Sequence, residues 1–298
     1  MAATYIVFAP PYTDKSAGVM CLWRLAETIN KIGRQALVIN CEIVNGNFII
    51  SLDGKEWIPC NENTIREMIS PLHNPVVIHG ENLDCKYFKG ANVARYYLNK
   101  MGVLLNKGNA SEGEYKVAFD KLFCDPYDYL LPQYTGKISL EIARGLQFMP
   151  RNLDLTYIGK GHIYHAVTPV VSGTVCLTRT WPDSADQYLK LLENTRFLYS
   201  YDSITSVLLD AVLMGAAPIL LSWEPLGEKV MRSNVDDAFP LYTIDSFGRE
   251  AFDFEKFVVQ RNIYIDKCLR NHVGLDLSVK SMCLDIERFF KISSHQCQ

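Results

Sequence analysis

Residues 196–221, RFLYSYDSITSVLLDAVLMGAAPILL, carry the pattern that most restricts the fold of this chain. An apolar run leads into the polar turn Tyr201-Asp202-Ser203, a helical pattern follows, and the apolar run 217–221 ends the stretch. A buried strand, a helix and a second buried strand in this order are typical of an α/β unit with a parallel sheet. Ligands of such sheets bind beyond the carboxyl ends of the strands. The sequence therefore predicts a binding site at this turn.

The residues after the turn suit an anion. Ser203, Thr205 and Ser206 supply hydroxyl groups where the predicted helix begins, and the free backbone N–H groups of a helix N-terminus carry partial positive charge. A phosphate or diphosphate, and hence a nucleotide-like ligand, is the first hypothesis. The alternative is that Asp202 or Ser203 is only an N-cap, a common role that contributes about 1 kcal/mol.

The first half of the chain alternates between strand and helix patterns. Apolar runs predict strands at 4–9, 35–41 and 74–79, and apolar spacings of three and four predict a helix at 19–32. Residues 46–59, centred on Asp53-Gly54, predict a peripheral hairpin. The remaining expectations for this half are a helix at 93–98, a strand at 103–105 and one more element at 117–123.

The alternation restarts after residue 150, which predicts two consecutive α/β modules. We expect an N-terminal Rossmann-like module at 1–150 and a C-terminal one at 151–298 that ends in a helical tail. The predicted elements of the second module are strands at 155–158, 173–178, 197–201 and 217–221, helices at 183–194 and 204–215, and a tail helix at 254–290 interrupted near Gly274. The predicted class is α/β, with two doubly wound modules and a cleft between them.

Composition excludes several classes of protein. Hydrophobic residues make up 48% of the 298 positions and charged residues 21%, which is typical of a globular protein with a sizeable core. The net charge of -3 disfavours a polyanionic partner, so we expect no nucleic-acid binding. The N-terminus predicts a strand instead of a signal peptide, and no apolar stretch approaches the roughly 20 residues of a membrane span. Nine cysteines without a C-x-x-C pair indicate reduced thiols in a soluble, cytoplasmic protein.

Three stretches together resemble a known family. They are SAGVMCLWRLAETINKIGRQALVI, then ENLDCKYFKGANVARYYLNKMG, then YIGKG followed by RFLYSYDSITSVLLDAVLMGAAPIL. Their order is similar to that in GT-B-type glycosyltransferases, especially enzymes of microbial surface-polysaccharide and O-antigen synthesis. The resemblance is strongest between residues 157 and 221 and thin after 224.

The resemblance implies that the second module binds a nucleotide-sugar donor and the first binds an acceptor, a glycan or a lipid-linked glycan. A lipid-linked acceptor would bring the enzyme to the inner membrane face. Lys160, between two glycines at a strand end, suits a diphosphate, and the acidic residue that relatives place after the turn to hold ribose corresponds here to the shorter Asp210. The predicted donor-binding residues are Gly18, Gly159, Lys160, Gly161, Tyr201, Asp202, Ser203, Thr205, Ser206 and Asp210.

No metal or other cofactor is expected. GT-B enzymes are generally metal-independent, and the Asp-x-Asp motif of the metal-dependent glycosyltransferases is absent from the sequence. The nearest approximations are the acidic pairs at 253–255 and 285–287, in segments predicted to be helical. His162 and His165 have a ligand-like spacing but no neighbouring cysteine or carboxylate, so a loop role is favoured over zinc binding.

An inverting transfer needs a general base for the acceptor hydroxyl. The candidates are Glu81 and His79, after the strand at 74–79, and Asp14, after the first strand. Glu81 is preferred, because relatives often carry an acidic residue at this strand end. A retaining enzyme would need no such base, and the sequence leaves both stereochemical outcomes open.

Two other functions are weighed against a glycosyltransferase. One keeps the fold and changes the reaction to that of a sugar-nucleotide epimerase or another phosphate-handling relative. The other is a degenerate GT-B-like module that binds a nucleotide or a partner protein without catalysis. The oligomeric state is left open.

Overall fold

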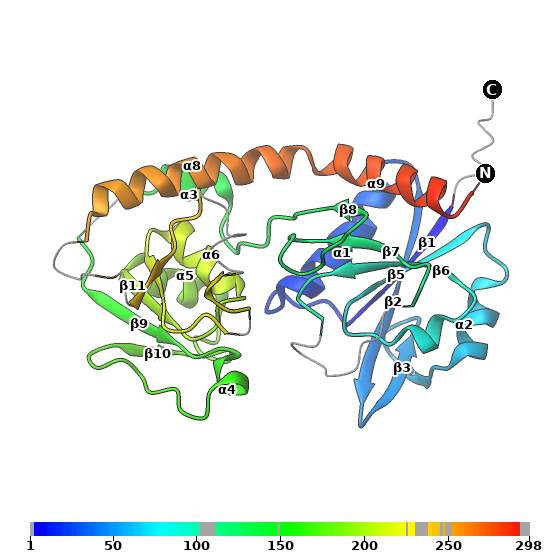
Figure 1. Cartoon of the computed structure of the whole chain (residues 1–298), viewed down its shortest axis with the longest axis horizontal. Coiled ribbons are helices and arrows are strands. Elements are labelled where there is room, and N and C mark those ends of the chain that lie inside the picture. Colours follow the sequence, from blue (N-terminus) through cyan, green and yellow to red (C-terminus); the bar gives the residue numbers. More distant parts are fainter. Residues whose placement is uncertain are drawn as a thin grey trace. The chain divides into compact units, whose positions relative to one another are not determined.

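The computed structural model forms two compact units, which are drawn in Figure 1. Unit 1 comprises residues 1–133 and 273–298, and unit 2 comprises residues 134–272. The structure describes residues 3–101, 111–147, 150–224, 226–229, 238–244, 247 and 252–292. The chain thus divides after Gln133 instead of near residue 150, and its last helix returns to unit 1.

Unit 1 is built on an eight-stranded, mostly parallel sheet with the order β4-β3-β2-β1-β5-β6-β7-β8. Only the β2-β3-β4 edge is antiparallel, and the turn at Asp53-Gly54 joins β3 to β4, which confirms the predicted hairpin. The strands are β1 (Thr4–Ala9), β2 (Gln35–Val44), β3 (Asn47–Ser51), β4 (Ile58–Pro59), β5 (Pro75–Gly80), β6 (Asn92–Tyr97), β7 (Tyr115–Ala118) and β8 (Tyr129–Leu130).

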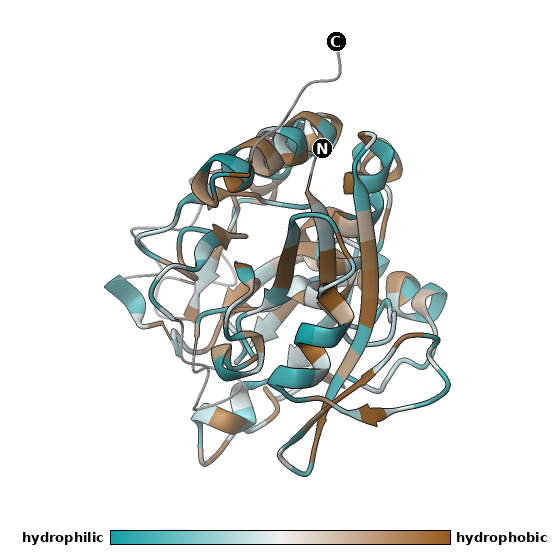
Figure 2. Cartoon of the chain, turned by 90° about the vertical axis from the view of Figure 1, so that its right-hand side faces the viewer, coloured by the Kyte–Doolittle hydropathy of each residue, from teal (hydrophilic) through white to brown (hydrophobic). Residues whose placement is uncertain are grey.

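Helices complete unit 1. They are α1 (Ala17–Lys31), α2 (Glu62–Ile69), the short 3-10 helix η1 (Cys85–Phe88) and the terminal α9 (Leu275–Phe289). In Figure 2 the inner strands are largely hydrophobic, and hydrophilic residues lie on the outer helices and loops. A parallel strand that is covered on both faces has a continuous apolar sequence. The strands β1 and β5 could therefore be predicted from their apolar runs.

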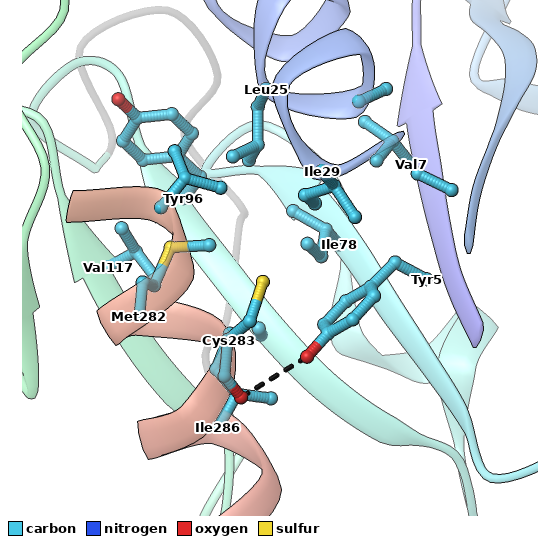
Figure 3. Packing of buried hydrophobic residues seen from close by; sticks show 14 of the residues in the cluster. Tyr5, Val7, Leu25, Ile29, Ile78, Tyr96, Val117, Met282, Cys283 and Ile286 are labelled. Atoms are coloured by element: carbon cyan, nitrogen blue, oxygen red, sulfur yellow. Dashed lines mark hydrogen bonds between the residues drawn. The ribbon is translucent and has the colours of Figure 1, made fainter. Parts of the chain in front are cut away.

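Helix α9 belongs to the core of unit 1 although it lies at the end of the chain. Its residues Met282, Cys283 and Ile286 are fully buried in the core of unit 1. In Figure 3 Cys283 faces Tyr5 of β1, and Met282 lies beside Val117 of β7. The Tyr5 hydroxyl donates a hydrogen bond of 3.2 Å to the Cys283 carbonyl. Burial of the two large apolar side chains, Met282 and Ile286, stabilises this docking by about 2 kcal/mol each. The tail is thus a structural part of the first sheet module.

Unit 2 contains a five-stranded parallel sheet with the order β10-β9-β11-β12-β13. Its strands are β9 (Leu153–Tyr157), β10 (Val175–Leu177), β11 (Thr195–Ser200), β12 (Ala217–Leu220) and β13 (Tyr242–Thr243). Its helices are α3 (Leu140–Gly145), α4 (Gly161–Tyr164), α5 (Ala185–Glu193), α6 (Ser206–Met214) and α8 (Phe254–Val273). The second α/β alternation is therefore confirmed, and so is the break of the tail near Gly274. Both units have mainly parallel sheets with helices, which confirms the predicted α/β class with two modules.

A buried arginine joins α8 to the rest of unit 2. Arg261 is fully buried, and its guanidinium donates to the carbonyls of Val212 and Leu213 at the end of α6 and of Ala143 in α3. A cation at the carbonyl ends of two helices satisfies acceptors that lack partners within the helix. Burial among these groups and the nearby Arg151 lower the pKa of Arg261 to about 10.

One predicted helix in unit 1 is wrong. Residues 93–98 were expected to be helical, whereas residues Asn92–Tyr97 form the parallel strand β6, paired with β5 and β7. Its side chains are almost all buried on both faces, so the run lacks the alternation that marks a half-buried strand. Of the element expected at 117–123, only the start is strand β7. The strand expected at 103–105 lies outside the described residues.

The described helices include none that is both long enough and apolar enough to cross a membrane. The cysteines in the described ranges are free thiols. Burial raises the pKa values of Cys21, Cys41 and Cys60 to about 12, which keeps these thiols protonated and unreactive at neutral pH.

Candidate functional site

The predicted donor-site residues meet at the topological switch point of the sheet in unit 2. Strand β9 pairs with β10 on one side and with β11 on the other, so the chain leaves β9 and β11 in opposite directions. The loops that follow these strands start together, because Tyr201 N donates to the Tyr157 carbonyl at 3.0 Å. The carboxyl ends of strands at a switch point form the crevice where ligands of open α/β sheets bind.

Asp202 joins the two loops of this crevice. Its carboxylate accepts hydrogen bonds from the backbone N–H of Lys160, at 3.0 Å, and of Ile204, at 3.1 Å. Only 1% of its surface is exposed. Burial raises the pKa of Asp202, and the charge of Lys160 together with the backbone donors opposes that rise. The contacts therefore give Asp202 a positioning role within the loops.

The Lys160 side chain lies over the same turn. Its Nζ is 3.7 Å from Asp202 Oδ1 and donates to the Ile204 carbonyl. The side chain as a whole is 16% exposed. An ammonium group has three N–H donors on a flexible stem and can serve as a point charge for a phosphate.

Neighbouring side chains leave no room for a Cβ at the two glycines beside Lys160, Gly159 and Gly161. A Cβ on Gly161 would lie 2.5 Å from the Tyr201 Cβ, and one on Gly159 would lie 2.7 Å from Asp202 Oδ2. Gly159 also has φ +51°, a left-handed conformation that costs other residues free energy. These glycines let the β9 loop pack against the β11 turn, and their role in ligand approach stays a prediction.

Helix α6 begins directly after this turn. Thr205 is its N-cap and accepts a hydrogen bond of 3.3 Å from Val207 N, and Ser206 is the first helical residue. The Ser203 hydroxyl donates to the Glu224 carbonyl. The alternative that Asp202 or Ser203 is the N-cap is therefore wrong, because Thr205 caps the helix. Anion binding at the start of α6 stays a prediction.

The histidines lie in the segment that follows Lys160, and Tyr201, directly after β11, contacts the same segment. His162 Nδ1 is 2.7 Å from the Gly159 carbonyl, and the rings of His165 and Tyr201 are 5.8 Å apart. The Tyr201 hydroxyl donates to the Pro169 carbonyl at 3.1 Å. Among the described residues no three His, Cys, Asp or Glu side chains form a group that could hold a metal ion. Metal independence remains a prediction.

The structure places Asp210 in a buried polar network. It is fully buried, Oδ1 accepts from Lys137 N at 2.8 Å, and Oδ2 accepts from the Tyr188 hydroxyl at 3.0 Å. The Lys137 ammonium lies 4.7 Å from the centre of the Tyr188 ring. Both carboxylate oxygens thus have protein partners that the sequence spacing did not indicate. Ribose binding by Asp210 stays a prediction, and its observed contacts stabilise the packing of α6 against α5.

Burial raises the pKa of Asp210 to about 6, against the opposing hydrogen bonds from Lys137 and Tyr188. A raised carboxyl pKa means that the folded state holds its proton at a pH where the unfolded state has lost it. Between about pH 4 and 6 the folded protein therefore binds more protons, and this group makes the free energy of unfolding fall as pH rises. The full destabilisation applies above pH 6.

We expect Asp210→Asn to reduce that loss, because asparagine keeps an acceptor for Lys137 N and titrates no proton. Relative to the parent protein, the variant should gain on the order of 2 kcal/mol between pH 4 and pH 7. Urea unfolding at both pH values measures this difference. Asp183→Asn, at an exposed position of the same unit, is the control, and an equal pH dependence in all three proteins would contradict the prediction.

The predicted base residues of unit 1 lie at the switch point of the other sheet. Strand β1 pairs with β2 on one side and β5 on the other. A cavity of about 340 Å³ opens beside these strand ends, with mainly apolar walls and two polar side chains. Its lining residues are Phe8, Pro10, Leu22, Cys41, Glu42, Ile43, Asn82 and Leu83.

Glu81 follows β5 directly and precedes the lining residue Asn82. It is 8% exposed, and Oε2 accepts a hydrogen bond of 3.0 Å from Leu98 N. Burial raises the pKa of Glu81 to about 7, although backbone N–H groups, including that of Asn99, and the charge of Arg95 lower it. A carboxylate with this pKa is matched to proton transfer at neutral pH.

His79 lies in β5 and is fully buried. Its ring stacks on Phe88, with centroids 4.5 Å apart, and Nδ1 is 2.7 Å from the Gly80 carbonyl. Burial and the charge of Arg95 lower the pKa of His79 to about 3, so the ring is neutral at pH 7. Its Nε2 has no hydrogen-bond partner among the described residues. The complete burial makes His79 a poorer candidate base than Glu81.

Sequence reasoning missed the ion pair behind these residues. Arg95 and Glu114 form a buried bidentate pair, with N···O distances of 2.7 and 2.9 Å. Arg95 also donates to the carbonyls of Leu83 and Glu81, at 2.6 and 3.3 Å. It thereby fixes the loop that carries Glu81 and part of the cavity wall. An arginine inside the apolar run VARYYL was the available signal, because a buried charge needs a partner.

Asp14 lies in the segment between β1 and α1, and Gly18 lies in the first turn of α1. Asp14 is exposed. Gly18 is the second residue of α1, and a Cβ there would meet the Leu98 side chain at an ordinary 3.7 Å. The structure therefore shows no steric need for glycine at this position. Gly18 does lie beside the residue whose N–H binds Glu81, which brings the start of α1 to the same sheet edge.

No family model matches the chain. No curated protein matches it either. Among solved structures, the chain is similar to MurG of Acinetobacter baumannii, with 7% identity and a TM-score of 0.43 over 98% of this chain and 100% of that one. An α-glucosyltransferase in complex with UDP and a 13-mer DNA containing an HMU base has 9% identity and a TM-score of 0.39, over 96% and 95% of the two chains. An α-glucosyltransferase in complex with UDP has 8% identity and a TM-score of 0.40, over 97% of this chain and 96% of that one. At these values the function has to be argued from the chain's own residues.

Proposed function

We propose that this protein is a metal-independent glycosyltransferase that moves a sugar from a nucleotide-sugar donor to a glycan or lipid-linked glycan. Synthesis of a microbial surface polysaccharide such as O-antigen is the role that we assign to it. The observation that carries the proposal is the switch point of unit 2, where Lys160 and the start of α6 lie on the loops after β9 and β11.

This crevice suits a diphosphate leaving group. Negative charge develops on the nucleoside diphosphate as the glycosidic bond breaks, and donors that are already in place stabilise it. The Lys160 ammonium supplies a full positive charge, and the first-turn amides of α6 supply the partial charge of a helix N-terminus. Asp202 holds the two loops together through the backbone N–H of Lys160 and Ile204.

Unit 1 offers the groups that an acceptor requires. The cavity beside Asn82 and Leu83 has apolar walls and polar side chains, which is typical of pockets for small organic ligands. Glu81, with its pKa raised to about 7, is the group that we assign to accept the proton of the attacking hydroxyl. Asp14 is the alternative, because it is exposed at the same sheet edge.

The test is hydrolysis and transfer with a panel of nucleotide sugars, with and without a chelator. We expect free nucleoside diphosphate to be released from at least one donor, and the chelator to leave the rate unchanged. Glycan, lipid-linked glycan and DNA are offered in parallel as acceptors, and no transfer to DNA is expected. Calorimetry that shows no heat with any nucleotide or nucleotide sugar would refute the donor site. Nucleotide binding without turnover would instead favour a degenerate binding module.

A further inference from the structure

The segment that follows Lys160 exposes apolar side chains to solvent. It runs through α4, the loop after it and the edge strand β10, and Figure 1 shows the long loop that joins α4 to β10. The exposed fractions are 53% for Ile163, 75% for Val167, 45% for Val170, 40% for Val175 and 43% for Trp181. We call these five residues the exposed apolar segment. Single exposed apolar residues are ordinary, whereas these five fall within residues 163–181, and we take this concentration along the chain as the starting point of the inference.

The backbone of this segment is anchored to the body of unit 2. Val171 N donates to Thr156 Oγ1 at 3.1 Å, and Thr174 Oγ1 donates to the Val171 carbonyl at 2.7 Å. The Pro169 carbonyl accepts from the Tyr201 hydroxyl at 3.1 Å. These bonds hold the loop in place on both sides of Val170. The apolar side chains are therefore presented to solvent by a fixed backbone.

The charge of the segment is unusual for this protein. The chain has 33 acidic residues and a net charge of -3, yet no Asp or Glu occurs from residue 155 to residue 182. Arg179, within this stretch, is exposed. The acids nearest to the end of the stretch are the exposed Asp183 and Asp186. A stretch that carries cations and no acid of its own limits repulsion from anionic lipid headgroups, and each Lys or Arg near such a surface adds about 1 kcal/mol.

We propose that the exposed apolar segment contacts the surface of an anionic phospholipid bilayer. Aliphatic side chains enter the boundary between headgroups and acyl chains, and Trp181 lies at the headgroup level that tryptophan prefers. The composition favours lipid over a protein partner. Protein interfaces are enriched in aromatic residues, Met and Arg, whereas this segment exposes Val and Ile beside a single Trp and a single Arg. The proposal goes beyond the transfer reaction and does not depend on it.

The experiment is co-sedimentation of the full chain with vesicles of phosphatidylcholine and phosphatidylglycerol at a ratio of three to one. The parent protein is expected to bind. Val167→Ser with Val170→Ser should lower the partition coefficient about tenfold, because two exposed valines lose their apolar contact with the bilayer. Val259→Ser, 59% exposed on α8 of the same unit, is the matched control and should bind as the parent does.

Three results would overturn the proposal. They are no vesicle binding by the parent protein, equal binding by the double variant, and association of the chain with itself through the segment, seen as a dimer in analytical ultracentrifugation that the double variant lacks. All variants change exposed residues, so their thermal unfolding should match that of the parent. Nucleotide binding is measured without vesicles, so failure of the donor site and failure of the membrane surface are separate outcomes.

Discussion

Lys160→Met is expected to weaken the binding of a nucleoside diphosphate between about tenfold and 100-fold. The variant keeps the length and apolar stem of the side chain and removes the ammonium group, whose charge-assisted hydrogen bonds contribute roughly 1.5–3 kcal/mol. Isothermal titration with the preferred diphosphate measures the change. In the parent protein the affinity should also fall as salt rises, because a partly exposed charge is screened.

Lys190→Met is the control for this substitution. Lys190 lies on α5 of the same unit and is exposed, so the change in net charge is equal while the crevice is intact. Lys160→Met also removes the cation beside buried Asp202, so thermal unfolding must show that the variant is folded at the temperature of the titration. A folded Lys160→Met protein with the affinity of the parent would leave Lys160 as a purely structural residue.

The fold was largely predictable because the signals are local. Apolar runs such as 4–9 and 217–221 each fill one buried parallel strand, and the spacing of apolar residues in α1 marks its buried face. Strand β6 was missed because its buried aromatic and charged residues imitate a helix pattern. The return of α9 to unit 1 was missed for another reason. Its partners, including Tyr5, are almost the whole chain away, and no spacing rule encodes such a contact.

The candidate site was predictable in position and less so in contacts. The ends of β9 and β11 are visible in the sequence, and the switch point brings Lys160 and Asp202 together as polar turns at such strand ends predict. The hydrogen bonds of Asp210 and Glu81 depend on Lys137 N and Leu98 N, backbone groups that no residue type reveals. Sequence therefore located the carboxylates, while the fold decided which of their oxygens have protein partners.

Glu81→Gln is expected to lower the turnover of an inverting transfer by roughly 10²- to 10⁴-fold and to leave the affinity for the donor unchanged. Glutamine fills the same space and can still accept from Leu98 N, but it cannot take a proton from the acceptor. In the parent protein kcat/KM should fall as pH drops through about 7, where Glu81 becomes protonated, and the variant should lack this limb. If Glu81 were purely structural, its substitution would change stability and leave this fall of kcat/KM at low pH in place.

Glu67→Gln, at an exposed position on α2, is the control. Normal turnover by a folded Glu81→Gln protein would eliminate Glu81 as the base and favour either Asp14 or a retaining mechanism that needs none.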